Sequence, residues 1–195
     1  MRTEEIEMLI EIRILSRGGQ GGVTGAKMLA YAGHLDGKYV QAIPKYGAER
    51  KGAPIFADIR IGDEHVKTHA PVIIENTHSW IVLEPSLLGT IPFEKLSSGT
   101  TIVINTRQVP EELKNNPKLK IGIVDAVAIA RECGLIKSGT EMVSTIMLGA
   151  WVKATEGVSL ESLKQAIIHQ FGEGALTDAN FRSVEMAYAQ FVSVV

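Results

Sequence analysis

The sequence has very little cysteine, and this scarcity excludes several kinds of site. Cys133 is the only cysteine among 195 residues, so the chain forms no internal disulfide. An iron–sulfur cluster held by cysteines needs several thiolates, and so does a cysteine-rich zinc site. Neither kind of site can be built from this chain alone.

Net charge and long apolar runs are also lacking. The formal net charge of −2 argues against a nucleic-acid-binding protein, since such proteins are usually strongly basic. No apolar run approaches the roughly 18 residues that would cross a membrane. The N-terminal sequence MRTEEIEMLI is acidic and lacks the long apolar stretch of a targeting peptide. We expect a cytoplasmic protein with no nucleic-acid partner and no membrane partner.

What remains is the composition of an ordinary globular protein. Hydrophobic residues make up 45% of the chain and charged residues 22%, which is not the composition of a disordered chain. Because domains commonly contain about 100 to 200 residues, we expect a single domain over residues 1–195.

Six segments have the pattern of β-strands. Residues 55–61 alternate, with apolar side chains on one face and Phe56, Asp58 and Arg60 on the other, which indicates an antiparallel strand. Most of the others are short apolar runs bounded by turn residues, as in buried strands. The predicted strands are Met8–Ser16, Tyr39–Pro44, Ile55–Ile61, Trp80–Glu84, Thr101–Asn105 and Lys120–Asp125.

Helical patterns lie between these strands and fill the last third of the chain. The predicted helices are Gly22–His34, Val127–Cys133, a stripe from Val143 to Ala154, Leu160–Phe171 and Thr177–Val192. Ser159 is the expected N-cap of the fourth. Alternating strands and helices predict an α/β fold: a three-layer α/β/α sandwich with a mixed, mainly parallel sheet and a helical C-terminal third.

A glycine-rich loop follows the first predicted strand. Five of the 19 glycines lie within residues 16–25, SRGGQGGVTG. Such a loop lets backbone N–H groups approach an anion, and Arg17 adds a positive charge. The dinucleotide pattern fails because Thr24 stands at its third glycine, and no Gly-Lys-Ser/Thr of a P-loop follows. A tightly packed turn and an anion-approaching loop both remain open for Arg17, Gly18, Gly19, Gln20 and Gly21.

A second loop, residues 44–54 with the sequence PKYGAERKGAP, follows the second predicted strand. A solvated surface turn is the simpler interpretation. Two prolines, two glycines and an aromatic residue also suit an ordered wall of a cleft beside the glycine loop, because ligands of α/β folds bind beyond the carboxyl ends of strands. The candidate residues here are Tyr46, Gly47, Glu49, Arg50 and Gly52.

The two loops together carry a resemblance to a known family. The Arg-Gly-Gly-Gln-Gly turn of residues 17–21, followed by Pro44 and the Tyr-Gly-x-Glu-Arg-x-Gly-Ala-Pro loop of residues 46–54, resembles the gamma subunit of 2-oxoacid:ferredoxin oxidoreductases of the pyruvate type. The Met-Leu-Gly-Ala sequence of residues 147–150 is also similar to that family. The resemblance covers about residues 10–155.

The resemblance implies a subunit of an oxidoreductase that decarboxylates a 2-oxoacid, most simply pyruvate, to an acyl-CoA and passes electrons to ferredoxin. Thiamine pyrophosphate, Mg²⁺, [4Fe-4S] clusters and coenzyme A then belong to the complex, on or shared with thiamine-binding, large and ferredoxin-like partner chains. This chain has one cysteine and no Gly-Asp-Gly signature of thiamine enzymes, so we expect it to hold none of these cofactors alone. It is not expected to be active alone.

Several alternatives stay open at this point. The two loops either lie at a subunit interface or contact coenzyme A. Ser16 and the residues before Met147 depart from the family pattern, so 2-oxoglutarate, a branched-chain or an aromatic 2-oxoacid competes with pyruvate as the substrate. A free-standing nucleotide- or CoA-binding module is the rival function.

Other candidate residues favour structural roles. His65, His69 and His78 do not lie on a convincing helix with an acidic ligand, so no metal site is predicted. No residue is assigned a catalytic role. Buried positions are expected for Cys133, Trp80 and Trp151, and Asp125 is expected to cap the helix that follows it.

Overall fold

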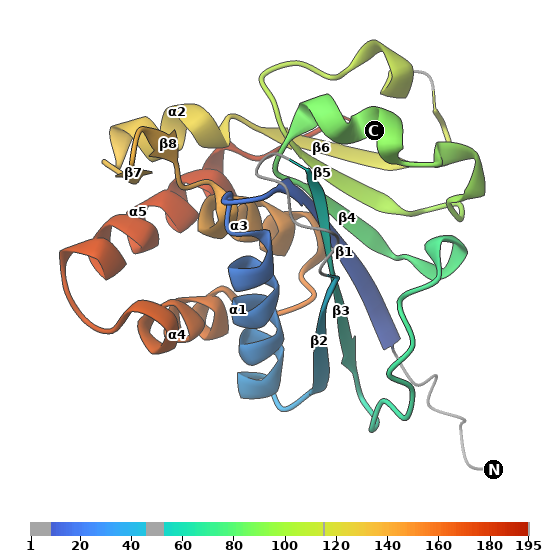
Figure 1. Ribbon diagram of the computed structural model, residues 1–195, viewed down its shortest axis with the longest axis horizontal. Coiled ribbons are helices and arrows are strands. Elements are labelled where there is room, and N and C mark those ends of the chain that lie inside the picture. The colour runs from blue at the N-terminus through green and yellow to red at the C-terminus, as the bar shows by residue number, and fades with distance from the viewer. Residues whose placement is uncertain (1–8, 46–52, 115, 195) are drawn as a thin grey trace.

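The computed structural model describes residues 9–45, 53–114 and 116–194. Its centre is a mixed seven-stranded sheet in the order β2-β3-β1-β4-β5-β6-β9 (Figure 1). The strands are β1 (Leu9–Arg17), β2 (Tyr39–Lys45), β3 (Pro54–Gly62), β4 (Ser79–Val82), β5 (Thr101–Asn105), β6 (Lys120–Val124) and β9 (Val192–Ser193). A separate two-stranded hairpin consists of β7 (Ile136–Lys137) and β8 (Thr140–Glu141).

Strand direction decides which loops meet. β1, β4, β5 and β6 are parallel, whereas β3 is antiparallel to both of its neighbours, β1 and β2. The antiparallel strand predicted from the alternation of residues 55–61 is therefore confirmed. Because β1 and β2 run in the same direction, both end at the carboxyl edge of the sheet, together with β4, β5 and β6.

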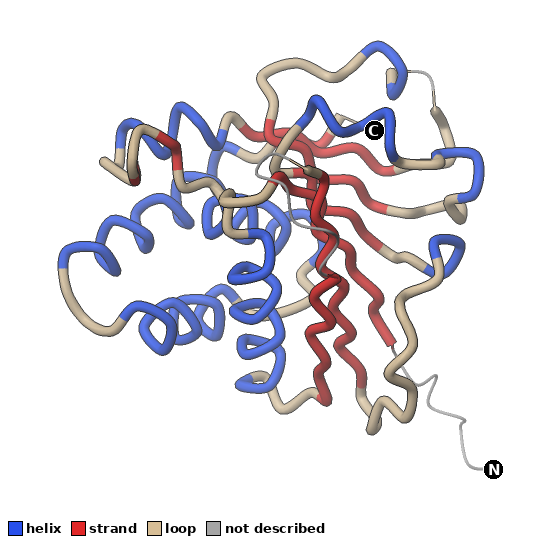
Figure 2. The backbone as a smooth tube through the Cα atoms, viewed as in Figure 1, coloured by secondary structure: helices blue, strands red, loops and turns tan. Residues whose placement is uncertain are grey.

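The α-helices lie on one side of the sheet (Figure 2). α1 and α3 pack directly on the strands, and α4 and α5 pack on α1 and α3 as an outer layer. The Trp151 indole N–H donates to Ser79 Oγ at 2.8 Å and ties α3 to β4. The bounds are α1 (Gly22–Leu35), α2 (Ala126–Glu132), α3 (Ser144–Thr155), α4 (Leu160–Phe171) and α5 (Ala175–Gln190).

The other face of the sheet is covered by loops and 3-10 helices over a second apolar cluster that includes Leu15 and Trp80. Prolines stand at the N-terminal ends of three of these short helices, which fits their preference for the first turn. The 3-10 helices are Ile74–Asn76, Pro85–Thr90, Phe93–Lys95 and Glu111–Leu113.

The predicted α/β fold with a mixed, mainly parallel sheet and a helical C-terminal third is confirmed. The third layer of the predicted sandwich consists of 3-10 helices and loops rather than α-helices. Both tryptophans and Cys133 are buried, as predicted. The predicted helix over 177–192 is wrong at its end, because α5 stops at Gln190 and Val192 pairs with Ile123 as β9. The small β7–β8 hairpin was not predicted, since two-residue strands carry no periodicity.

Two buried ion pairs cross from β1 to β3. The register places Arg13 opposite Asp58 and Glu11 opposite Arg60. Arg13 binds both carboxylate oxygens of Asp58, at 2.6 and 2.9 Å, and Arg60 Nε lies 2.7 Å from Glu11 Oε1. The covering segment, residues 63–78, lies over these pairs and supplies backbone carbonyls to both arginines. Burial of these charges is tolerated because each is paired with an opposite charge and both arginines also donate to carbonyls of this segment.

Asp36 joins the end of α1 to the start of α4. Its carboxylate accepts hydrogen bonds from the Ser159 N–H at 2.6 Å, from Ser159 Oγ at 2.9 Å and from Ser162 Oγ at 2.5 Å. Ser159 is the N-cap of α4, as predicted, and accepts from the Ser162 N–H. Burial raises the pKa of Asp36, but these hydrogen bonds and the charge of Lys38 outweigh it and leave the pKa below its usual value.

Replacing Asp36 with asparagine is expected to lower the free energy of unfolding by about 1 kcal/mol at pH 7. A carboxylate whose pKa is depressed by folding stabilises above its unfolded pKa of about 4, and this contribution fades as the pH falls through the folded value. Urea unfolding of both proteins at pH 7 and near pH 3 measures the difference. A difference that stays constant with pH would contradict the role of the ionised carboxylate.

Candidate functional site at the carboxyl edge of the sheet

The glycine loop connects β1 to α1 at the carboxyl edge. Gly19 and Gly21 have φ angles of +94° and +82°, which residues with a Cβ atom rarely adopt. A Cβ atom on Gly21 would also lie 2.9 Å from Ser144 Oγ at the start of α3. Both glycines therefore suit a sharp turn, and Gly21 also packs closely against Ser144, as the packed-turn interpretation predicts.

Side chains of the loop hold its backbone. Gln20 Oε1 accepts from the Arg17 N–H at 2.7 Å, and the Gln20 N–H donates to the Arg17 carbonyl at 3.1 Å. Gln20 thus closes the turn at two points. The Arg17 side chain is 39% exposed, so the turn carries a positive group at the molecular surface.

Glu84 and Ser86 lie against this loop from the end of β4. The Gln20 amide donates to Glu84 Oε2 at 2.9 Å, and Arg17 donates to Ser86 Oγ at 2.9 Å. Ser86 Oγ in turn donates to Glu84 Oε1 at 2.7 Å. Burial raises the pKa of Glu84, but the hydrogen bonds from Ser86 and Gln20 and the charge of Arg17 outweigh it and hold the pKa below its usual value.

The residues predicted for the second loop, Tyr46, Gly47, Glu49, Arg50 and Gly52, lie outside the described residues. The next described residue places the end of this loop beside the glycine loop. The Gly18 N–H donates to the Ala53 carbonyl at 3.3 Å, and Arg17 is opposite Pro54 in the β1–β3 register.

A cleft of about 480 Å³ lies against the glycine loop. Gly19, Gly21 and Thr24 form one wall, and the β7–β8 hairpin forms another. Ser144 and Phe171 also line the cleft. The hairpin therefore belongs to the edge that carries the glycine loop.

The far part of the same edge is structural. Asp125 accepts from the Ala128 N–H at 3.0 Å and caps α2, as predicted, and it also pairs with the exposed Arg107. Asn105 links the ends of β4 and β6, donating to the Leu83 carbonyl and accepting from the Ala126 N–H, both at 3.0 Å. These bonds fix the strand ends next to Glu84.

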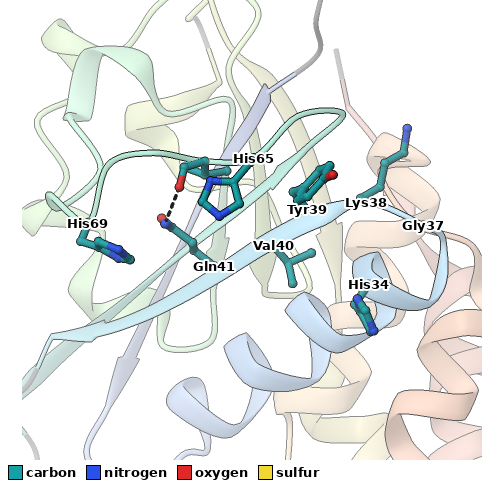
Figure 3. Close-up of a pocket in the computed structure, with 9 residues that line it drawn as sticks. His34, Gly37, Lys38, Tyr39, Val40, Gln41, His65 and His69 are labelled. Atoms are coloured by element: carbon teal, nitrogen blue, oxygen red, sulfur yellow. Dashed lines mark hydrogen bonds between the residues drawn. The ribbon is translucent and has the colours of Figure 1, made fainter.

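A second cavity, of about 580 Å³, lies beside the edge strand β2, away from the glycine loop (Figure 3). His65 and His69 line it, and His65 packs edge-on against Tyr39. His78 instead accepts a hydrogen bond from the Glu11 N–H at 3.1 Å through Nδ1. Among residues 9–45, 53–114 and 116–194, no three histidine, cysteine or acidic side chains are grouped to hold a metal ion.

Cys133 does not fit an iron–sulfur role in this structure. Its side chain is buried, its Sγ lies 3.6 Å from Met186 Sδ, and burial raises the pKa of the thiol. One buried thiol has none of the further thiolates that a cluster needs. No helix in the described part of the chain is long and apolar enough to cross a membrane.

Comparison with known proteins gives a consistent result over nearly the whole chain. The family model described as pyruvate ferredoxin/flavodoxin oxidoreductase matches residues 11–190. The pyruvate/ketoisovalerate oxidoreductases common subunit gamma of Thermococcus kodakarensis is 41% identical over 189 residues, which covers 94% of this chain and 98% of that protein.

Solved structures agree with that match. The pyruvate oxidoreductase subunit PORC of Thermotoga maritima aligns with a TM-score of 0.80 and 36% identity, over 96% of this chain and 99% of that chain. The 2-oxoglutarate:ferredoxin oxidoreductase of Magnetococcus marinus, solved with 2-oxoglutarate, coenzyme A and succinyl-CoA bound, aligns with a TM-score of 0.77 at 18% identity. That alignment covers 93% of this chain and 31% of the other, and it shows a shared fold.

Proposed function

Because this chain belongs to the pyruvate ferredoxin/flavodoxin oxidoreductase family, we propose that it is the gamma subunit of a thiamine-dependent 2-oxoacid:ferredoxin oxidoreductase. Residues 1–195 form one gamma-type domain that packs on the catalytic subunits. The enzyme oxidatively decarboxylates pyruvate to acetyl-CoA. The observation that carries this proposal is the family match over residues 11–190, which includes the fixed glycine loop at the carboxyl edge.

The cofactors of the reaction belong to the partner chains in this proposal. The single cysteine cannot hold a [4Fe-4S] cluster, and the sequence has no Gly-Asp-Gly signature for thiamine pyrophosphate and Mg²⁺. The thiamine-binding, large and ferredoxin-like subunits supply these groups and deliver electrons to ferredoxin. This chain contributes residues at its surface. The residues that face the subunit interface or coenzyme A are Arg17 to Gly21, Tyr46, Gly47, Glu49, Arg50 and Gly52.

A branched-chain 2-oxoacid is the second candidate substrate. The relative from Thermococcus kodakarensis is named as a gamma subunit common to pyruvate and ketoisovalerate oxidoreductases. A gamma subunit that serves two enzymes does not itself select the 2-oxoacid, so the substrate is chosen by the other chains.

Reconstitution tests this function. The chain is expressed with and without thiamine-binding, large and ferredoxin-like subunits, and dye reduction is measured with pyruvate, 2-ketoisovalerate and 2-oxoglutarate in the presence of coenzyme A. We expect activity from the complete complex and none from this chain alone. Full activity without this chain would overturn the proposal. Measurable binding of coenzyme A or a nucleotide to the isolated chain in calorimetry, together with full activity of the complex without this chain, would support a free-standing binding module instead.

Replacing Arg17 with alanine is expected to raise either the KM for coenzyme A or the subunit dissociation constant about tenfold, since charged contacts at ligands and interfaces are commonly worth about 1–2 kcal/mol. The isolated chain should stay folded because the Arg17 side chain is 39% exposed. Enzyme kinetics measure the KM for coenzyme A, and titration of the subunit onto the remaining complex measures the dissociation constant. Together they show which of the two constants changes.

The matched control is Arg107→Ala, which removes an exposed arginine that is also paired with a carboxylate at the carboxyl edge. We expect this control to change neither constant more than about twofold, because exposed ion pairs contribute little. Equal effects of the two substitutions would contradict a specific role for Arg17.

A further inference from the structure

Glu84 reaches the glycine loop because β4 lies beside β1. The two strands are parallel, with Val82 opposite Leu15, so the chain leaves both strands at the same level of the carboxyl edge. Glu84 is 64 residues from Gln20, yet its Oε2 accepts the Gln20 amide at 2.9 Å. Strand order, rather than sequence proximity, brings this carboxylate to the loop.

Both oxygens of the Glu84 carboxylate are engaged. Oε1 accepts from Ser86 Oγ at 2.7 Å and from the Ser86 N–H at 3.3 Å, while Oε2 accepts from Gln20 and lies 3.9 Å from Arg17 Nε. The Glu84 side chain is 25% exposed, so it is partly shielded from competing water. An ionised acceptor of this kind makes stronger hydrogen bonds than a neutral one.

These bonds determine how Gln20 is oriented. Its amide nitrogen is directed to Glu84, so its Oε1 is left to accept from the Arg17 N–H at 2.7 Å. The reversed amide would place its oxygen against the carboxylate and its NH₂ against a backbone donor. Glu84 therefore selects the Gln20 orientation that closes the turn.

Arg17 is held from the same side. One of its terminal nitrogens donates to Ser86 Oγ at 2.9 Å, and that hydroxyl donates its own proton to Glu84 Oε1 at 2.7 Å. The hydroxyl can accept from Arg17 because Glu84 takes its proton. Among the described residues, Ser86 and Glu84 contact the guanidinium and help to set its direction.

We propose that Glu84, acting through Ser86 and Gln20, is a positioning residue that presents Arg17 and the glycine loop to coenzyme A or to the catalytic subunits. This inference rests on the proposed function of the loop. It adds two residues that neither the loop motif nor the family match assigns. Glu84 itself touches no reacting atom in this role.

A purely local role for Glu84 makes a different prediction. Glu84 precedes the 3-10 helix Pro85–Thr90 and accepts from the Ser86 N–H as its N-cap. If capping were its whole role, Glu84→Gln would have the same effect whether or not Arg17 and Gln20 were present. A double-mutant cycle distinguishes the two, because only residues that act together give non-additive effects.

The experiment measures the KM for coenzyme A, kcat and the subunit dissociation constant of the reconstituted complex. Glu84→Gln is introduced into the natural chain and into a chain carrying Arg17→Ala and Gln20→Ala. We expect about a tenfold rise in the constant that Arg17→Ala raises, with kcat changed less than about twofold. In the Arg17→Ala, Gln20→Ala background we expect Glu84→Gln to add less than about twofold.

Asp125→Asn is the matched control, since Asp125 is also a helix-capping carboxylate paired with an arginine at this edge. It should leave both constants unchanged. If Glu84→Gln prevents folding, Ser86→Ala carries the same cycle with the carboxylate intact, and a rise of about threefold is expected.

Failure of the positioning role and failure of the loop's proposed function give different results. Equal effects of Glu84→Gln in the two backgrounds would overturn the positioning role and leave a capping role. No effect of Glu84→Gln and Ser86→Ala, while Arg17→Ala has one, would also overturn it. If Arg17→Ala and Gln20→Ala change neither constant, the proposed function of the loop fails, and the inference fails with it.

Discussion

Replacing Asp58 with alanine is expected to lower the free energy of unfolding by about 3–5 kcal/mol, because removing one partner leaves a buried charge uncompensated. Asp58 is fully buried and Arg13 is 4% exposed. The substitution removes two hydrogen bonds from Arg13, at 2.6 and 2.9 Å, and the acceptor of the Val72 N–H at 3.1 Å. Urea unfolding of the isolated chain measures the loss.

Removing both charges should cost much less than removing one. We expect Arg13→Met with Asp58→Leu to recover most of the lost stability, since an apolar pair avoids the cost of burying charge. The surroundings suit this exchange, because the rings of Phe56 and Trp80 lie 5.8 and 5.4 Å from the Arg13 guanidinium. Recovery should be incomplete, because Val72 loses partners for its N–H and its carbonyl.

An exposed ion pair provides the control for this prediction. Lys114→Ala removes a partner of Glu111 at the surface and is expected to change stability by less than about 0.5 kcal/mol. If the double variant proved as unstable as Asp58→Ala alone, the uncompensated charge would not be the cause of the loss.

The strands were predictable because their side chains alternate or form short apolar runs. The alternation also placed Asp58 and Arg60 on one face of β3, but it did not show what covers that face. The covering segment, residues 63–78, has little regular structure and buries Val66 and Val72 over the ion pairs. Its position depends on carbonyls that bind Arg13 and Arg60, and such contacts carry no periodic signal.

The candidate site was predictable in part for a similar reason. The density of glycine in residues 16–25 identified the turn at the end of β1, and the positive φ angles of Gly19 and Gly21 explain that density. Glu84 and Ser86 were missed because their contact with the loop requires β4 to lie next to β1. Neighbouring strands are set by the whole fold, so a carboxylate at the last position of the predicted strand Trp80–Glu84 was the only local signal.

Replacing Gly149 with alanine is expected to lower the free energy of unfolding by about 2 kcal/mol, although alanine is the better helix former. A Cβ atom at Gly149 would lie 2.7 Å from the Val184 carbonyl oxygen and 3.1 Å from Val184 Cα. These are backbone atoms of α5, so α3 and α5 must move apart as units. Overpacking of this kind costs roughly 3 kcal/mol, which exceeds the gain of about 1 kcal/mol in helix propensity.

Gly25→Ala is the matched control because Gly25 also lies inside a helix. A Cβ atom there would meet Ile14 and Ser144 at 3.6 Å, an ordinary van der Waals distance. Without a clash only the helix propensity remains, so this variant should be more stable than the natural chain by up to about 1 kcal/mol. The two glycines should therefore respond with opposite signs in thermal unfolding. If Gly149→Ala were also stabilising, the contact between α3 and α5 would not require glycine.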